Sequence, residues 1–184
     1  MIRFAWKPAS RLRARTPVDF ISPFHPTPRT AVLAVGFREA KRVRVFPDGW
    51  GESVRRFKPE VLAGPWEDLL RLAEQWDEGW TTPARGIVIF SFEGQPAPEA
   101  GLRDLLWERF GLPLFEQYLD TNLELLASEC DAHEGLHLAS RALQRPGFAL
   151  CTNVCPCGGT TPRLCRIEER EHSRTHAVAM ASGT

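Results

Sequence analysis

Two cysteines separated by a single residue, Cys155 and Cys157, form the most constraining pattern in this chain of 184 residues. A proline between them and a glycine after them are typical of a tight turn, which lets both thiols face one point. Upstream, Cys130 and His137 add two ligands of the kinds that structural zinc binds in a tetrahedron. We therefore predict a zinc site of Cys130, His137, Cys155 and Cys157 that joins two distant pieces of chain.

Other uses of these side chains stay open at this point. His133 competes with His137 for the fourth ligand position. Cys151 and Cys165 are reserve ligands, and with the Cys-x-Cys pair they make an all-thiolate rival site. Cys130 and His133 could instead form an activated thiolate–imidazolium pair, although no orienting Asn or Asp is identifiable. Cysteine is also a common small core residue, in which case these thiols bind nothing.

Composition excludes several classes of protein. The apolar share of 43% permits a real core, and 23 basic residues balance 23 acidic ones, so overall charge gives no case for nucleic acid as a partner. No run approaches the ~18–20 apolar residues of a membrane span, and no secretory signal is recognisable. The five cysteines are an odd number. Together these features predict a cytoplasmic protein, in whose reducing surroundings clustered thiols act as metal ligands or catalysts.

Apolar periodicity predicts strands that alternate with helices in the first two thirds of the chain. We expect strands at residues 30–37, 41–46, 60–64, 86–92 and 112–118, and helices at residues 65–76 and 96–110. The run GIVIFSF at residues 86–92 is nearly continuous in β-branched and aromatic residues, as in a strand covered on both faces. Alternation of this kind implies a parallel sheet with right-handed crossovers.

The helical period disappears after residue 118. Short strand-like runs at 123–130, 135–140 and 147–153 are separated by turn residues and predict an antiparallel extension. The expected fold class is thus α/β, with a short parallel sheet and flanking helices, continued by antiparallel strands that carry the zinc clip. We expect a basic, Pro-rich arm over residues 1–29, a single α/β domain over 30–168 and a flexible tail over 169–184.

Four segments between residues 57 and 164 carry a family resemblance. They are FKPEVLAGPWEDLLRLAEQ, GIVIFSFEGQPAPEAGLRDLLWERFGLPLFEQY, ASECDAHEGLHL and CPCGGTTPRL. In this order they resemble the central part of phenylacetate–CoA ligases and related acyl-adenylate-forming enzymes. The last two are similar to the Glu-Cys…Gly-Leu-His and Cys-x-Cys-Gly…Thr-Pro-Arg elements of the zinc-containing members. The resemblance implies an adenylate-binding fold, with ATP or AMP and CoA as the family's ligands.

The chain departs from the family where nucleotide chemistry takes place. No Gly-rich phosphate loop is recognisable, although such a loop is what lets backbone N–H groups approach phosphate oxygens. The family's Tyr-Gly-x-Thr/Ser-Glu element corresponds to residues 118–122, where Leu119 replaces the glycine and Asn122 replaces the magnesium-binding glutamate. Asp120 is the candidate substitute for that glutamate. The ribose-binding aspartate and the lid lysine are not recognisable either.

A second candidate site follows the predicted strand at residues 86–92. Glu93 and Gly94 lie where ligands bind in open parallel sheets, in the crevice past the carboxyl ends of the strands. With Tyr118 and Asp120 they could form a remnant nucleotide or small-molecule site. The alternative is a plain connecting turn.

The sequence predicts a zinc-stabilised, non-catalytic relative of phenylacetate–CoA ligases that acts as a binding or partner module. The rival is one component of a split acyl- or aryl-CoA ligase, with the missing parts supplied by a second polypeptide. Expected partners are that polypeptide and a small carboxylic acid or nucleotide, and neither nucleic acid nor a membrane. Whether the chain is an enzyme is left open by these patterns, because phosphoryl chemistry needs positioned cations that are not identifiable.

Overall fold

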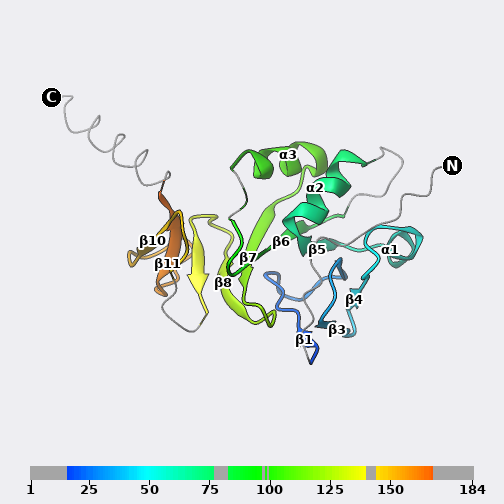
Figure 1. Ribbon diagram of the computed structural model, residues 1–184, viewed down its shortest axis with the longest axis horizontal. Coiled ribbons are helices and arrows are strands. Elements are labelled where there is room, and N and C mark those ends of the chain that lie inside the picture. The colour runs from blue at the N-terminus through cyan, green and yellow to red at the C-terminus, as the bar shows by residue number, and fades with distance from the viewer. Residues whose placement is uncertain (1–15, 77–82, 97, 99, 140–143, 168–184) are drawn as a thin grey trace.

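The computed structural model describes residues 16–76, 83–96, 98, 100–139 and 144–167 (Figure 1). Its helices are α1 (Glu52–Phe57), α2 (Trp66–Glu74) and α3 (Ala100–Phe110). Its strands are β1 (Val18–Asp19), β2 (Thr30–Val32), β3 (Phe37–Arg38), β4 (Val43–Val45), β5 (Val61–Pro65), β6 (Gly86–Phe92), β7 (Leu114–Leu119), β8 (Leu125–Glu129), β9 (Leu136–Leu138), β10 (Phe148–Cys151) and β11 (Arg163–Arg166). None of the helices in this part of the chain is long and apolar enough to cross a bilayer.

One large sheet runs through the molecule in the order β10-β11-β9-β8-β7-β6-β5-β2-β4. The strands from β4 to β7 are parallel, whereas β8, β9, β11 and β10 are each antiparallel to their neighbours. β1 and β3 form a separate parallel pair. The expected fold class is confirmed: a parallel sheet with flanking helices continues into antiparallel strands, and these carry a Cys/His cluster.

The helices pack on one face of the parallel half of the sheet (Figure 1). Leu69 of α2 and Leu106 of α3 are completely buried in one apolar cluster with Ile87 and Ile89 of β6. Every residue of β6 is buried, because its alternate side chains enter the cores on the two faces. Burial of an aliphatic side chain of this size contributes about 1.5–3 kcal/mol. The continuous apolar run of β6 therefore marks the centre of the sheet.

Residues 16–29 cover the other face of the sheet. The ring of Phe24 lies 4.9 Å from that of Phe115, and Phe20 lies 6.2 Å from Phe90. The side-chain amide of Gln117 donates to the carbonyl of Ile21 at 2.6 Å. This part of the predicted basic arm therefore belongs to the packed structure, because its aromatic side chains fill the second core. The rest of the arm and the predicted tail at 169–184 lie outside the described residues.

Several elements differ from the sequence-based prediction. The strand expected at 30–37 ends at Val32, since the chain leaves the sheet toward Gly36, which has a positive φ of 91°. The strand expected at 41–46 is limited to 43–45, and the helix expected at 96–110 begins at Ala100. Helix α1 and strand β11 were not predicted. β11 has the sequence Arg-Leu-Cys-Arg, which lacks the apolar pattern of a buried strand, although its Arg163 is only 1% exposed.

Candidate metal centre

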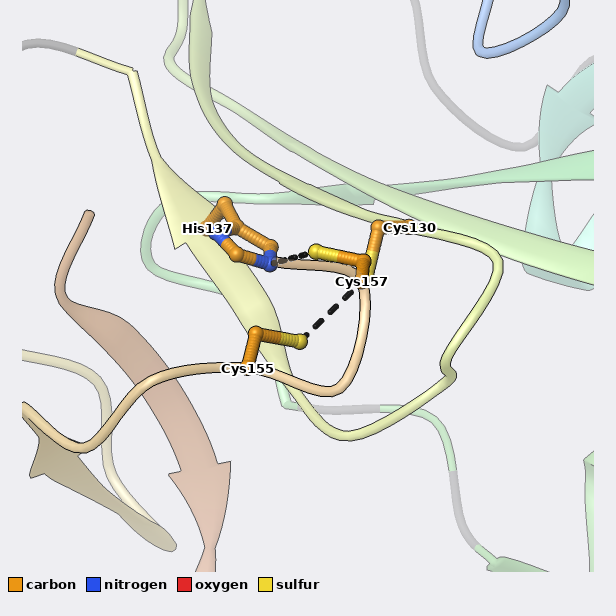
Figure 2. Close-up of side chains that lie close together, drawn as sticks. All are labelled: Cys130, His137, Cys155 and Cys157. Atoms are coloured by element: carbon orange, nitrogen blue, oxygen red, sulfur yellow. Dashed lines mark hydrogen bonds between the residues drawn. The ribbon is translucent and has the colours of Figure 1, made fainter. Parts of the chain in front are cut away.

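The antiparallel half of the sheet brings the four predicted ligands together. Cys130 directly follows β8, His137 lies in β9, and Cys155 and Cys157 lie in the turn between β10 and β11. Their ligand atoms all lie within 4.8 Å of one another (Figure 2). β9 pairs with both β8 and β11, with Arg163 opposite His137. The sheet register is therefore what carries the two distant pieces of chain to one point.

The distances within the cluster suit a shared ion. The Sγ atoms of Cys130 and Cys155 are 3.7 Å apart, and Cys157 Sγ is 3.5 Å from His137 Nε2. A disulfide requires a sulfur–sulfur distance of about 2.05 Å, so the first pair is not bonded. All five cysteines are free thiols. The arrangement is a Cys₃His cluster that could hold a metal ion.

The Cys155–Gly159 turn is shaped by backbone hydrogen bonds. The Gly158 N–H donates to the Cys155 carbonyl at 2.8 Å, and the Cys155 N–H donates to the Gly159 carbonyl at 3.0 Å. Gly158 has a φ of +85°, a conformation that glycine adopts without strain. A Cβ atom on Gly159 would lie 2.8 Å from His137 Cε1, so the backbone approaches the imidazole closely. The glycines thus let the turn fold around its two thiols.

The second loop, from Cys130 to His137, is equally tight. The His133 N–H donates to the Cys130 carbonyl at 3.0 Å, which closes a turn just after the thiol. Gly135 has a φ of +100°, and a Cβ atom there would lie 2.6 Å from the Leu164 carbonyl oxygen on β11. Since no side chain fits between these strands, the glycine permits β9 to lie beside β11.

His137 is oriented for ligation through Nε2. Its Nδ1 lies 2.7 Å from Thr161 Oγ1, and a hydrogen bond of this kind holds the orientation of the ring. Burial, and then the nearby positive charge of Arg163, lower the pKa of His137. A neutral imidazole with a free Nε2 lone pair is the form that binds a metal.

The thiols differ in acidity. Burial raises the pKa of Cys130 to about 11, whereas the N–H of Gly159, which donates to Cys157 Sγ at 3.4 Å, lowers the pKa of Cys157. A buried thiol becomes a thiolate only when a positive charge compensates for its lost hydration. The turn supplies part of that compensation to Cys157. A cation bound between the sulfurs would supply it to Cys130.

The rival ligands lie elsewhere. His133 Nδ1 is 3.2 Å from a carboxylate oxygen of Glu129, and its ring packs 5.0 Å from that of Phe115. It lies outside the cluster, and the ring nitrogen nearest a partner faces Glu129. Among the described residues, Cys151 and Cys165 also stay outside the cluster.

The residues predicted for a second site have the following local contacts. Glu93 and Gly94 form the exposed turn after β6, where the Glu93 N–H donates to the Leu119 carbonyl at 2.8 Å. Tyr118 is 3% exposed, and the Arg145 guanidinium lies 4.3 Å from its ring centre. Burial raises the pKa of Tyr118.

Asp120 uses its carboxylate within its own turn. One oxygen accepts hydrogen bonds from the N–H groups of Asn122 at 2.8 Å and Glu124 at 2.9 Å. These bonds close the hairpin between β7 and β8, as an Asx turn does. Asp120, the candidate substitute for the family's glutamate, therefore has a role in closing this hairpin.

A buried ionic network beside the candidate metal centre was not predicted from the sequence. Glu116 on β7 and Glu129 on β8 are each about 4% exposed as side chains, and arginines from distant segments surround them. The available signal was Glu116 itself, an acidic residue inside the apolar run LPLFEQY, because a buried charge requires a partner. The sequence does not show which arginines those partners are.

No protein-family model and no curated protein sequence matches this chain. Among solved structures, the chain is similar to a 2-hydroxyisobutyryl-CoA ligase in an open conformation, solved in complex with 2-HIB-AMP and CoA. The two share 17% sequence identity at a TM-score of 0.51, over 76% of this chain and 45% of the ligase chain. The chain thus spans less than half the length of that ligase. At this level of identity the likeness concerns the fold, which is that of part of an acyl-CoA ligase.

Proposed function

We propose that the Cys₃His cluster is a structural zinc site. Tetrahedral zinc, with bonds of about 2.3 Å to sulfur and 2.05 Å to nitrogen, separates two sulfurs by about 3.8 Å and a sulfur from a nitrogen by about 3.6 Å. The corresponding distances here are 3.7 Å and 3.5 Å. Four protein ligands leave no open position for water or substrate, which favours a stabilising role over a hydrolytic one.

Metal analysis tests this proposal directly. Protein purified without added metal should contain about one equivalent of zinc, measured by inductively coupled plasma mass spectrometry. Cobalt substitution should give the intense visible absorption of a tetrahedral thiolate site. Less than about half an equivalent, together with stability that a chelator leaves unchanged, would count against the site.

We further propose that the domain is a non-catalytic relative of phenylacetate–CoA ligases and acts as a binding or partner module. The observation that carries this proposal is the state of residues 118–122. Tyr118 is packed against Arg145, Asp120 closes its own turn, and Asn122 occupies the place of the family's magnesium ligand. Asn122 carries no charge and one oxygen of Asp120 is held within the turn, so residues 118–122 lack the family's glutamate for the magnesium ion that neutralises the phosphates of ATP.

Carboxylate-dependent exchange of pyrophosphate into ATP measures adenylation by itself. We expect the zinc-loaded protein to show no exchange above background with short fatty acids, hydroxy acids or aryl acids. Titration calorimetry with AMP and CoA would report binding without chemistry. Exchange by the pure chain would overturn the non-catalytic proposal, whereas binding of either ligand without exchange would support a binding module.

A second candidate is one component of a split ligase in the cytoplasm. It is favoured by the match to 45% of the length of a complete acyl-CoA ligase, because another polypeptide could supply the phosphate loop and lid. The product of a neighbouring reading frame that encodes such parts should then restore exchange when mixed with this chain. The carboxylic acid that supports pyrophosphate exchange in this mixture would be the substrate of the split ligase.

A further inference from the structure

Two buried carboxylates lie side by side between helix α3 and the antiparallel strands. Glu129 accepts two hydrogen bonds from Arg103 of α3, each 3.0 Å long, and one from the N–H of Glu116 at 2.8 Å. Glu116 accepts from Ser91 at 2.7 Å and from Arg145 at 2.8 Å. Each carboxylate therefore has one arginine of its own.

A third arginine, Arg166 on β11, has no carboxylate of its own. Its Nη1 donates to the carbonyl of Pro98 at 2.8 Å, and its Nη2 is 3.7 Å from the nearest oxygen of Glu116. That Nη2 is buried, and no described residue accepts a hydrogen bond from it. Among the described residues, three arginines thus face two glutamates, which leaves one positive charge in excess. Buried, unsatisfied donors of this kind are rare and call for a partner.

Arg145 adds to this excess of donors. Its side chain is 1% exposed and stacks on the rings of Tyr118 and Phe148, at 4.3 Å and 4.4 Å from their centres. Only Nη1 reaches Glu116, and Nε and Nη2 have no acceptor among the described residues. Arg145 and Ser91 both donate to Oε1 of Glu116, whereas Oε2 lies 3.7 Å from Arg166 Nη2, which is an ion pair without a hydrogen bond.

Arg166 lines a cavity of about 130 Å³. At about 30 Å³ for each water, this space would take roughly four waters or one small polyatomic ion. The charged side chains in its walls are Arg103, Glu116, Glu129 and Arg166. The side chain of Arg166 is 19% exposed, and the surplus positive charge of the described residues favours an anion as the occupant.

We propose that this cavity binds a small oxyanion, a group of carboxylate or phosphate size. Arg166 is its principal partner, because a planar guanidinium presents paired N–H donors that match two oxygens of such an ion. A single negative charge balances the network, whereas a cation would increase the excess. None of the four thiol and imidazole ligands lines the cavity, so the proposal does not depend on the identity of the metal.

Titration calorimetry of the metal-loaded protein with formate, acetate, phosphate and chloride tests the proposal. Ionic strength is held constant with a sulfonate salt too bulky for the cavity. We expect formate, acetate or phosphate to bind with a Kd in the millimolar range or tighter. Acetate without phosphate would identify a carboxylate site, the reverse a phosphate site, and binding of both a general oxyanion site.

Three variants decide whether the binding occurs at Arg166. Arg166→Gln should weaken it by about ten- to a hundredfold, the effect of removing a hydrogen bond to a charged group. Arg166→Lys keeps the positive charge but loses the paired donors, so it should bind the oxyanion at least about tenfold more weakly than the wild type. This variant also tests the proposal if Arg166→Gln fails to fold. Arg109→Gln, at the exposed end of α3, changes the net charge by the same amount and should bind as the wild type does.

Two results would overturn the proposal. One is the absence of binding heat with every oxyanion on the wild-type protein, which would leave a cavity filled by water. The other is equal affinity of the wild type and the Arg166 variants, which would place the anion elsewhere.

Discussion

Replacing Cys155 with alanine tests whether one ion holds the ends of the antiparallel strands together. Cys130 and Cys155 are 25 positions apart, and their sulfurs lie 3.7 Å from each other. A cross-link that closes a loop of this length lowers the entropy of the unfolded chain by an amount equivalent to about 3.5 kcal/mol at 25 °C. We expect Cys155→Ala to lower the free energy of unfolding by about this amount, a large share of the ~5–15 kcal/mol typical of a domain.

The assay is urea unfolding, followed by tryptophan fluorescence and circular dichroism with and without a chelator. Wild-type protein should lose stability on chelation, whereas Cys155→Ala should already be metal-free and should not respond. Cys151→Ala is the matched control, because it removes a thiol from β10 outside the cluster and should keep the metal. A Cys155→Ala protein that retains a full equivalent of zinc and the wild-type unfolding midpoint would refute the reasoning.

Three further substitutions should change metal binding or stability. Gly159→Ala should weaken zinc binding measured by competition with a chromophoric chelator, because the new Cβ would lie 2.8 Å from His137 Cε1 and push the ring away. Gly101→Ala should instead raise the thermal midpoint slightly, since the site is open within α3 and alanine is favoured there by up to about 1 kcal/mol. The backbone N–H of Arg29 donates to the Glu60 carboxylate and lowers the pKa of that carboxyl from its usual value. The ionised carboxylate therefore stabilises the folded protein above the usual pKa, and this contribution is lost as the pH falls through the lower pKa of the folded state. In urea unfolding, Glu60→Gln should therefore have a lower free energy of unfolding than the wild type at pH 7, and this difference should shrink in strong acid. A difference that grew as the pH fell would contradict the prediction.

Local patterns were sufficient for the strands at the centre of the sheet. The run at 86–92 became β6 with every residue buried, and the strand expected at 60–64 became β5 at Val61–Pro65. Such runs can be recognised in the sequence because a strand between two cores needs apolar side chains on both faces. The ends of helices and strands were harder to predict, as at Val32 and Ala100, because they depend on where the chain stops packing against neighbouring elements.

The metal centre was largely predictable for a chemical reason. Few residue types bind a soft metal, and a Cys-x-Cys turn with one more cysteine and a histidine leaves few combinations. The choice of His137 over His133 was harder, since both lie within seven residues of Cys130. It depended on the register of β9 against β8 and β11, which points one ring at the sulfurs while Glu129 holds the other.

The sequence by itself thus determined the alternating α/β order, the antiparallel continuation and the cysteine and histidine candidates for a metal cluster, because periodicity and ligand chemistry are local properties. Only the tertiary structure decided that Phe20 and Phe24 pack against the second core, that Tyr118 stacks on Arg145, and that Arg166 lines a cavity where the described arginines outnumber the carboxylates. These contacts join segments far apart in the chain. Each results from strand order, register and the need to compensate a buried charge, and none of these leaves a signature within a short stretch of residues.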